Sequence, residues 1–263
     1  MNELNTIFEV NGICYIILTE NTVTVIGRTL EYSCDIIIPE SVTCNNVKYS
    51  VTEIGRCAFS CCSRLTSIII PDSVTEIGEE AFFDCSELTS IRIPDSVTKI
   101  GCGAFFGCSG LTSVHIPDPI IEISDGAFLG CSGLTSVTIP DSVTEIGRGA
   151  FCECSRLTSI RIPDSVTEIE CSAFLGCSGL KSIYIGANVS RLGNDVFSYA
   201  FKGCKLIEDI AIAAVVPPAA DENNFYESVY AQATLRVPEA AIETYKTTEP
   251  WSKFATIKPL VKQ

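Results

Sequence analysis

The chain has 263 residues, 46% of them hydrophobic, and a formal net charge of −14 at pH 7. A surface this acidic repels phosphate backbones and anionic lipids, which disfavours binding to nucleic acids and to membrane surfaces. Because the sequence contains no run of 18 apolar residues, we also expect no membrane insertion.

Residues 1–50 are predicted to form an N-terminal β cap together with a first partial repeat. Asn11 and Gly12 stand between two apolar runs, which is the strongest short-range hairpin signal because a type I′ turn needs positive φ at both central residues. Thr22–Ile26 predicts a third strand. Such a meander would cover the apolar face and the unpaired strand edge of the first coil.

The segment Ile36–Thr43 already matches the later segment Ile91–Thr98. The matching prolines, Pro39 and Pro71, are 32 residues apart instead of 23, so nine extra residues are inserted around Cys44–Tyr49. Repeat proteins accept insertions at coil corners, and we therefore expect a loop or a hairpin here.

Residues 51–212 repeat with a period of 23 residues. Three columns show it: Pro71, Pro94, Pro117, Pro140 and Pro163; Cys62, Cys85, Cys108, Cys131, Cys154 and Cys177; Leu65, Leu88, Leu111, Leu134, Leu157 and Leu180. A period of this length predicts a repeat solenoid, a right-handed coil with a parallel β-sheet face, in which each repeat buries its apolar side against its neighbours.

Each repeat has three predicted parts. Leu88–Ile93 is a strand that ends at a proline, because proline cannot donate a hydrogen bond to the sheet. A Pro-Asp-Ser turn then leads into a short extended piece, Val97–Gly101. Ala104–Cys108 closes the coil as a tight turn or 3-10 stretch on the convex side, since it is too short for an α-helix.

The fifteen cysteines predict buried free thiols and not a disulfide framework. Seven of them occupy one column, the six named above plus Cys204. Equivalent residues of stacked coils are about 4.8 Å apart, close enough for disulfides, but a ladder favours one shared rotamer in which no two sulfur atoms point at each other. The other cysteines share no spacing: Cys14, Cys34, Cys44, Cys57, Cys61, Cys102, Cys152 and Cys171.

The repeat pattern changes after Ile185. Four residues are inserted around Ser198–Phe201, and Ile207–Ile212 then predicts a seventh strand in register. Residues 213–263 are predicted to be a C-terminal β/α cap. It would contain one last strand at Thr234–Pro238 and a helix over Glu239–Lys246, with Trp251, Phe254 and Ile257 as apolar anchors.

The repeat Leu-Thr-Ser-Ile-x-Ile-Pro-Asp-Ser-Val-Thr-x-Ile-Gly-x-x-Ala-Phe-x-x-Cys-Ser-x resembles the leucine-rich repeat of the BspA-like, Treponema-type family, over roughly residues 30–212. The resemblance implies surface or secreted proteins that bind host matrix proteins, other cells or other bacteria, and it carries no catalytic motif. A cell-surface or secreted location would require that a signal was removed. The alternative is cytoplasmic, because Met1–Ile7 lacks the pattern of a signal peptide.

The outward position of each strand predicts a contact strip on the sheet, because side chains alternate in and out along a strand. Its members are Ile69, Arg92, His115, Thr138, Arg161 and Tyr184. This position varies in chemical character within a monotonous repeat, and Arg, His and Tyr suit binding surfaces. The alternative interpretation is that an exposed position drifts because nothing constrains it.

The sequence offers no catalytic, cofactor or metal constellation. His115 is the only histidine, and the Ser and Asp residues near it recur in coils without a histidine. Cys61-Cys62 and Cys152 with Cys154 lack the matching second half of a zinc site. The aspartates of the Pro-Asp-Ser turns are expected to stabilise those turns and not to bind calcium.

These observations predict a non-enzymatic, monomeric binding module with a protein or glycan partner. The family resemblance implies a bacterial surface or secreted adhesin-type protein for host or intercellular contacts. Two alternatives stay open: a structural spacer or array segment of a larger surface assembly, and an intracellular protein-interaction scaffold.

Overall fold

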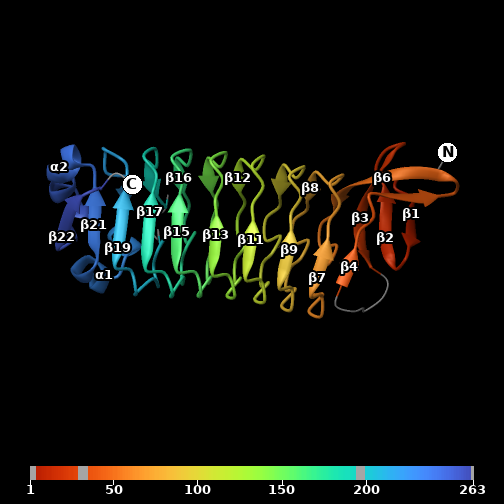
Figure 1. The fold of residues 1–263 in the computed structure, drawn as a ribbon, viewed down its shortest axis with the longest axis horizontal. Coiled ribbons are helices and arrows are strands. Elements are labelled where there is room, and N and C mark those ends of the chain that lie inside the picture. The colour runs from red at the N-terminus through yellow and green to blue at the C-terminus, as the bar shows by residue number, and fades with distance from the viewer. Residues whose placement is uncertain (1–3, 29–34, 194–198, 262–263) are drawn as a thin grey trace.

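The computed structural model describes residues 4–28, 35–193 and 199–261. They form one elongated stack of coils (Figure 1). The N-terminal strands lie at one end, and the short helices α1 (Glu227–Gln232) and α2 (Ile242–Thr247) lie at the other. The solenoid predicted from the 23-residue period is confirmed.

One side of the stack is a parallel sheet, here called the wide sheet. Its strands are β4 (Asp35–Ile37), β7 (Ser67–Ile69), β9 (Ser90–Arg92), β11 (Ser113–His115), β13 (Ser136–Thr138), β15 (Ser159–Ile162), β17 (Ser182–Ile185), β19 (Asp209–Ile212), β21 (Thr234–Val237) and β22 (Thr256–Pro259). They follow one another along the stack (Figure 1) in three hydrogen-bonded groups: β4-β7-β9, β11-β13 and β15-β17-β19-β21-β22. Strand β19 pairs with β17 in the predicted register, Ile183 opposite Ile210.

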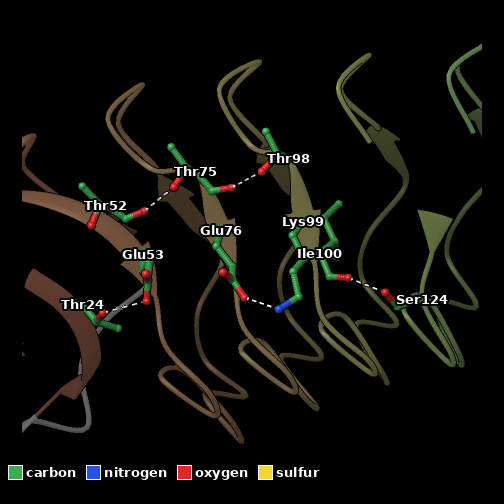
Figure 2. Close-up of polar contacts among 9 residues, drawn as sticks. All are labelled: Thr24, Thr52, Glu53, Thr75, Glu76, Thr98, Lys99, Ile100 and Ser124. Atoms are coloured by element: carbon green, nitrogen blue, oxygen red, sulfur yellow. Dashed lines mark hydrogen bonds and ion pairs between the residues drawn. The ribbon is translucent and has the colours of Figure 1, made fainter. Parts of the chain in front are cut away.

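A second side carries mostly two-residue strands and is called the narrow sheet. Its strands are β6 (Val47–Ile54), β8 (Glu76–Ile77), β10 (Lys99–Ile100), β12 (Glu122–Ile123), β14 (Glu145–Ile146), β16 (Glu168–Ile169), β18 (Arg191–Leu192) and β20 (Ala219–Ala220). Figure 2 shows how hydroxyl groups link these coils. Thr75 and Thr98 each donate to the threonine carbonyl of the preceding coil at 3.3 Å, and Ser124 donates to the Ile100 carbonyl at 2.6 Å.

The third side of each coil is a pair of tight turns. In one coil the amides of Ala104 and Cys108 donate to the carbonyls three residues earlier, each at 3.2 Å. Gly103 and Gly107 have φ values of 61° and 73°. These left-handed residues interrupt the chain too often for a continuous 3-10 helix, so the tight-turn form of the prediction is confirmed.

The interior is filled by columns of identical side chains. One is a continuous stack of phenylalanine rings with centroids 5.2–5.5 Å apart: Phe59, Phe82, Phe105, Phe128, Phe151, Phe174, Phe201 and Phe225. The other is the cysteine ladder, in which each thiol from Cys85 to Cys204 donates to a phenylalanine carbonyl of the preceding coil at 3.1–3.3 Å. Cys62, at the start of the ladder, lies 3.8 Å from the Ser60 carbonyl of its own coil instead, so the predicted shared orientation is confirmed from Cys85 onward.

The N-terminal cap is the predicted antiparallel meander of β1 (Ile7–Val10), β2 (Ile13–Ile17) and β3 (Thr22–Arg28). Its first turn has φ values of 53° and 80° at Asn11 and Gly12, as the hairpin prediction required. Strand β3 pairs in parallel with β6, so the meander extends the narrow sheet and not the wide one.

The nine-residue insertion is an antiparallel hairpin formed by β5 (Ser41–Cys44) and β6. It turns at Asn45 and Asn46, both in the left-handed region. Its Tyr49 is buried beside Phe8 of β1, with ring centroids 6.3 Å apart. The insertion therefore completes the cap instead of lying on the surface as a loop.

The C-terminal cap holds a helix and two strands that were not predicted, and one of these strands is β20, which pairs with β18 of the narrow sheet. Strand β21, predicted as the last strand, is followed by β22, which pairs with it in parallel. Helix α1 also lies in a segment for which no element was predicted. The predicted helix is present as a 3-10 turn, Glu239–Ala241, that leads into α2.

Two of the three predicted anchors of this cap are buried. The Trp251 indole donates to the Pro218 carbonyl at 2.9 Å, and Phe254 packs beside it, whereas Ile257 in β22 is half-buried. Of the four-residue insertion, Ser198 lies outside the described residues. Phe201 is described and continues the phenylalanine stack.

Candidate functional site on the wide sheet

The predicted strip exists as a row of outward side chains on the wide sheet. Strand pairing places Ile69 beside Arg92, His115 beside Thr138, and Arg161 beside Tyr184. The Ile69 side chain is 56% exposed although it is apolar, while Tyr184 is half-buried. The name "strip" is used below for these six residues and for the four that extend the row.

The row is longer than the sequence predicted. Ile37 precedes it, and Ala211, Arg236 and Lys258 continue it in register. Ile37 stands two residues before Pro39, as Arg92 stands before Pro94, so the repeat spacing was a signal that could have found it. No such signal marks Lys258, because β22 itself was not predicted.

Two of the strip cations are paired with aspartates of the Pro-Asp-Ser turns. Arg92 lies 3.4 Å from Asp72, and the Nε2 atom of His115 lies 3.7 Å from Asp95. Asp72 and Asp95 thus face the strip, whereas Asp164 accepts a hydrogen bond from the Ala187 amide in the turn of the next coil at 2.8 Å, as the turn-stabilising prediction expects. The adjacent serines also hold the turns, since Ser73 donates to the Val51 carbonyl of the preceding coil at 2.7 Å. Such exposed ion pairs contribute less than about 1 kcal/mol each.

The last five strands hold a different arrangement. The guanidinium of Arg161 lies over the ring of Tyr184, 4.1 Å from its centre. Arg236 donates through Nε to Asp209 at 2.7 Å. Together with Ala211 and the segment after β22, these residues line a groove of about 840 Å³.

The polar residues that flank the strip are used in the structure. The hydroxyls of Thr89, Thr112 and Thr135 donate to the threonine carbonyl of the preceding coil at 3.2–3.5 Å. These contacts hold one coil on the next. Most strip residues, by contrast, point away from the stacked interior.

The narrow sheet presents a row of opposite character. Its outward positions are mostly glutamates, and Glu76 is paired with Lys99 at 2.6 Å (Figure 2). Glu53 accepts a hydrogen bond from Thr24 at 3.0 Å (Figure 2). Further along, burial and the carboxylate of Glu122 raise the pKa of Glu145.

Within the described ranges, no group of three or more His, Cys, Asp or Glu side chains is arranged to hold a metal ion. In the same ranges no helix has the length and hydropathy to cross a bilayer. The Asp95–His115 pair lies on the surface, with 65% of the imidazole and 79% of the carboxylate side chain exposed.

Known proteins resemble this chain over most of its length. The family description "BspA type Leucine rich repeat region" matches residues 5–132 and 76–206, in six copies. A leucine-rich repeat protein from Bacteroides ovatus has 30% sequence identity and a TM-score of 0.61, with 96% of this chain and 76% of that chain covered.

The leucine-rich repeat protein of T. pallidum shares the fold. It has 20% sequence identity and a TM-score of 0.50, with 91% of this chain and 94% of that chain covered. None of the curated proteins matches the chain significantly. The family match covers more than half of the chain and agrees with the coils described above, so the chain belongs to the BspA-type leucine-rich repeat family.

Proposed function

We propose that this protein is a non-enzymatic binding module and that the strip on the wide sheet is its contact surface for another protein. One observation carries the proposal. The apolar columns on either side of the strip point into the core, the threonine column is hydrogen-bonded from coil to coil, and the serine column is uniform, whereas most strip residues are exposed and their chemistry varies from coil to coil. Its apolar, cationic and aromatic side chains are types that suit contact surfaces.

The chemistry of the strip changes from one end to the other, and a protein partner could recognise this direction. Ile37 and Ile69 form an exposed apolar start, at 68% and 56% exposure. Arg92 and His115 follow with their aspartates, and the groove lies at the far end. A flat, extended row of this kind fits a partner that contacts several coils at once.

The test is binding to arrays of bacterial surface proteins and of human extracellular proteins. The variant Arg92→Ala, His115→Ala, Arg161→Ala, Tyr184→Ala should lose the interactions that the unchanged chain makes. A control variant with Glu76→Ala, Lys99→Ala, Glu145→Ala and Glu168→Ala on the narrow sheet should retain them. Equal binding by the strip variant, with thermal unfolding showing that it is folded, would refute the strip.

A structural spacer is the second candidate function. The uniform phenylalanine stack, with ring planes within 8° of parallel through the repeats, supports a stiff rod. Removing the two repeats Val97–Ser142 joins Ser96 to Val143 in register. Array interactions that survive this deletion unchanged would favour a spacer whose partners contact the caps.

The proposed location is the cell surface or the secreted fraction, as the family resemblance implies, with a cytoplasmic scaffold as the alternative. Cys57, Cys61 and Cys102 are exposed thiols. A membrane-impermeant maleimide applied to intact cells should therefore label the protein. Labelling only after lysis would place the protein in the cytoplasm.

A further inference from the structure

The groove at the C-terminal end of the strip has the features of a built recognition site. Strand pairing sets Ala211 between Tyr184 and Arg236. The small alanine leaves a hollow between two large side chains, and Leu260 and Val261 form one wall. Figure 1 shows β15 to β22 side by side at this end of the stack.

Arg161 is the cation of this groove whose charge is not locally matched. Arg92 and Arg236 each lie within ion-pair distance of an aspartate, but none of the ion pairs in the described part of the chain includes Arg161. Its guanidinium lies on the ring of Tyr184 instead. The positive charge is therefore available to a partner.

The stacking of Arg161 on Tyr184 also determines which edge of the guanidinium can contact a partner. A guanidinium that lies over an aromatic ring has one face covered and its N–H edge open, and this edge matches a carboxylate in a bidentate pair. Ring contact holds the group in place before binding, which lowers the entropy cost of forming the pair. Arg236 and Lys258 add positive charge nearby, against the single carboxylate of Asp209.

The apolar wall of the groove indicates which side chain of a partner would lie next to the carboxylate that Arg161 binds. Val261 is 70% exposed, and Leu260 and Ala211 are apolar neighbours. Such a surface accepts an aliphatic side chain. A nucleic acid would bring a phosphate at every nucleotide against a chain charge of −14, whereas a peptide needs to bring only one carboxylate to Arg161.

We propose that this groove binds a protein segment in which an Asp or Glu carboxylate, held by Arg161, stands beside an aliphatic side chain that packs on Leu260 and Val261. The inference rests on the proposed function and names the chemistry of the partner at one end of the strip. It assigns no role to the cations of the other coils.

The experiment selects random dodecapeptides displayed on phage against the immobilised, intact chain. We expect peptides with an acidic residue next to Leu, Ile or Val to be enriched. Arg161→Met keeps an apolar stem on Tyr184 but removes the charge and the N–H groups, so it should lower the enrichment about tenfold or more. Arg161→Lys should recover part of it, because the charge returns without the planar fork.

Two further variants sharpen the result. Arg56→Met is the control, since Arg56 is an exposed arginine outside the strip that is paired with Glu79, and it should leave the selected peptides unchanged. Ala211→Leu adds bulk to the hollow from an outward position and should abolish the preference for the aliphatic neighbour. Circular dichroism checks that each variant is folded.

The inference is wrong if acidic residues are not enriched, if Arg161→Met selects the same peptides, or if Arg56→Met has an equal effect. Arg161-dependent binding to acidic glycans on a glycan array, without peptide enrichment, would also overturn it. Loss of array interactions in the strip variant combined with unchanged selection by Arg161→Met would leave the proposed function standing and refute this inference alone.

Discussion

The ring of Phe225 lies 5.5 Å from the ring of Phe201, with an angle of 3° between their planes. Phe225 belongs to the C-terminal cap, yet it continues the phenylalanine stack of the repeats. It also meets Tyr230, Trp251 and Phe254 edge-on, with centroids 5.8–6.2 Å away. One side chain thus joins the aromatic stack of the body to the aromatic cluster of the cap.

Replacing this residue should loosen the cap. Phe225→Ala removes a buried ring from both sets of contacts, and we expect a loss of about 3–5 kcal/mol in the free energy of unfolding. Chemical denaturation followed by circular dichroism measures it. Phe83→Ala is the control, because Phe83 is only half-buried and stacks on Phe106 at the surface. An equal loss in both variants would show that Phe225 has no special linking role.

Substituting glycine for either of two adjacent cysteines should change the stability of the fold in opposite directions. Cys61 is exposed and has a φ of 58°, at the position where another coil has Gly107. A left-handed non-glycine residue costs about 1–2 kcal/mol, and glycine loses about 0.5–1 kcal/mol in chain entropy, so Cys61→Gly should stabilise the fold by up to about 1 kcal/mol.

Cys62 is buried, and its thiol lies 3.8 Å from the Ser60 carbonyl. Cys62→Gly loses this buried group without relieving strain, and we expect a destabilisation of about 2 kcal/mol. Thermal unfolding of the two variants under the same conditions checks the pair. Shifts of the same sign would contradict the backbone argument.

Thiol labelling should separate the exposed cysteines from the ladder. In native buffer at pH 8, iodoacetamide should modify Cys57, Cys61 and Cys102 first. The thiolate is the reactive form, and burial raises the pKa of Cys131 and Cys154 well above the usual value. In guanidinium without reductant, all fourteen cysteines that the structure describes should titrate as free thiols, and widespread pairing would refute the ladder.

The same thiols should make the fold sensitive to alkali. The Cys108 thiol and burial raise the pKa of Cys85 to about 12, from an ordinary value of 9.0. A pKa that is raised in the folded state contributes stability that is present below pH 9 and is lost as the pH climbs toward 12. The contribution of Cys85 should fall by about 1.4 kcal/mol per pH unit in this window. Melting temperatures at pH 8, 9 and 10 test it, and a flat profile would contradict it.

The repeated interior was predictable because every coil solves the same burial problem. Phe105, Cys108 and Leu111 are fully buried, as their columns indicated. The wide sheet and its outward row followed from the alternation of side chains. Strand β22 was not predictable, because Thr256–Pro259 contains one apolar residue and ends in Lys and Pro. This pattern is typical of an irregular C-terminal segment.

The contacts of the strip were also beyond prediction. Arg92 and Arg161 have the same neighbours within their own repeats, Ile91 and Ile93 or Ile160 and Ile162. Arg92 nevertheless turns to Asp72, while Arg161 turns to Tyr184. The next coil offers histidine in one case and tyrosine in the other. A side chain in a stacked coil is therefore governed by its neighbour 23 residues away as much as by its own repeat.

The glutamate row of the narrow sheet gives the last prediction. Glu122, Glu145 and Glu168 stand beside one another in register, whereas Glu76 has Lys99 as its neighbour. Burial and then Glu122, Glu170, Glu168 and Asp125 raise the pKa of Glu145, so its ionised form is disfavoured in the folded chain. Protonation of Glu145 therefore favours folding. Its contribution to the free energy of unfolding is present below about pH 4.5 and is lost as the pH rises through the folded-state pKa.

Glu145→Gln should therefore raise the free energy of unfolding at pH 7, by less than about 1 kcal/mol because water screens the partly exposed carboxylate. The stability gain should shrink with added salt. It should vanish at pH 4, where Glu145 is mostly protonated and therefore neutral, like the glutamine that replaces it. Glu76→Gln is the matched control and should lower stability at pH 7, since it breaks the pair with Lys99. Denaturant titrations at pH 4 and pH 7 measure both variants. A stability gain from Glu145→Gln that persists at pH 4 would show that packing, and not repulsion within the row, is responsible.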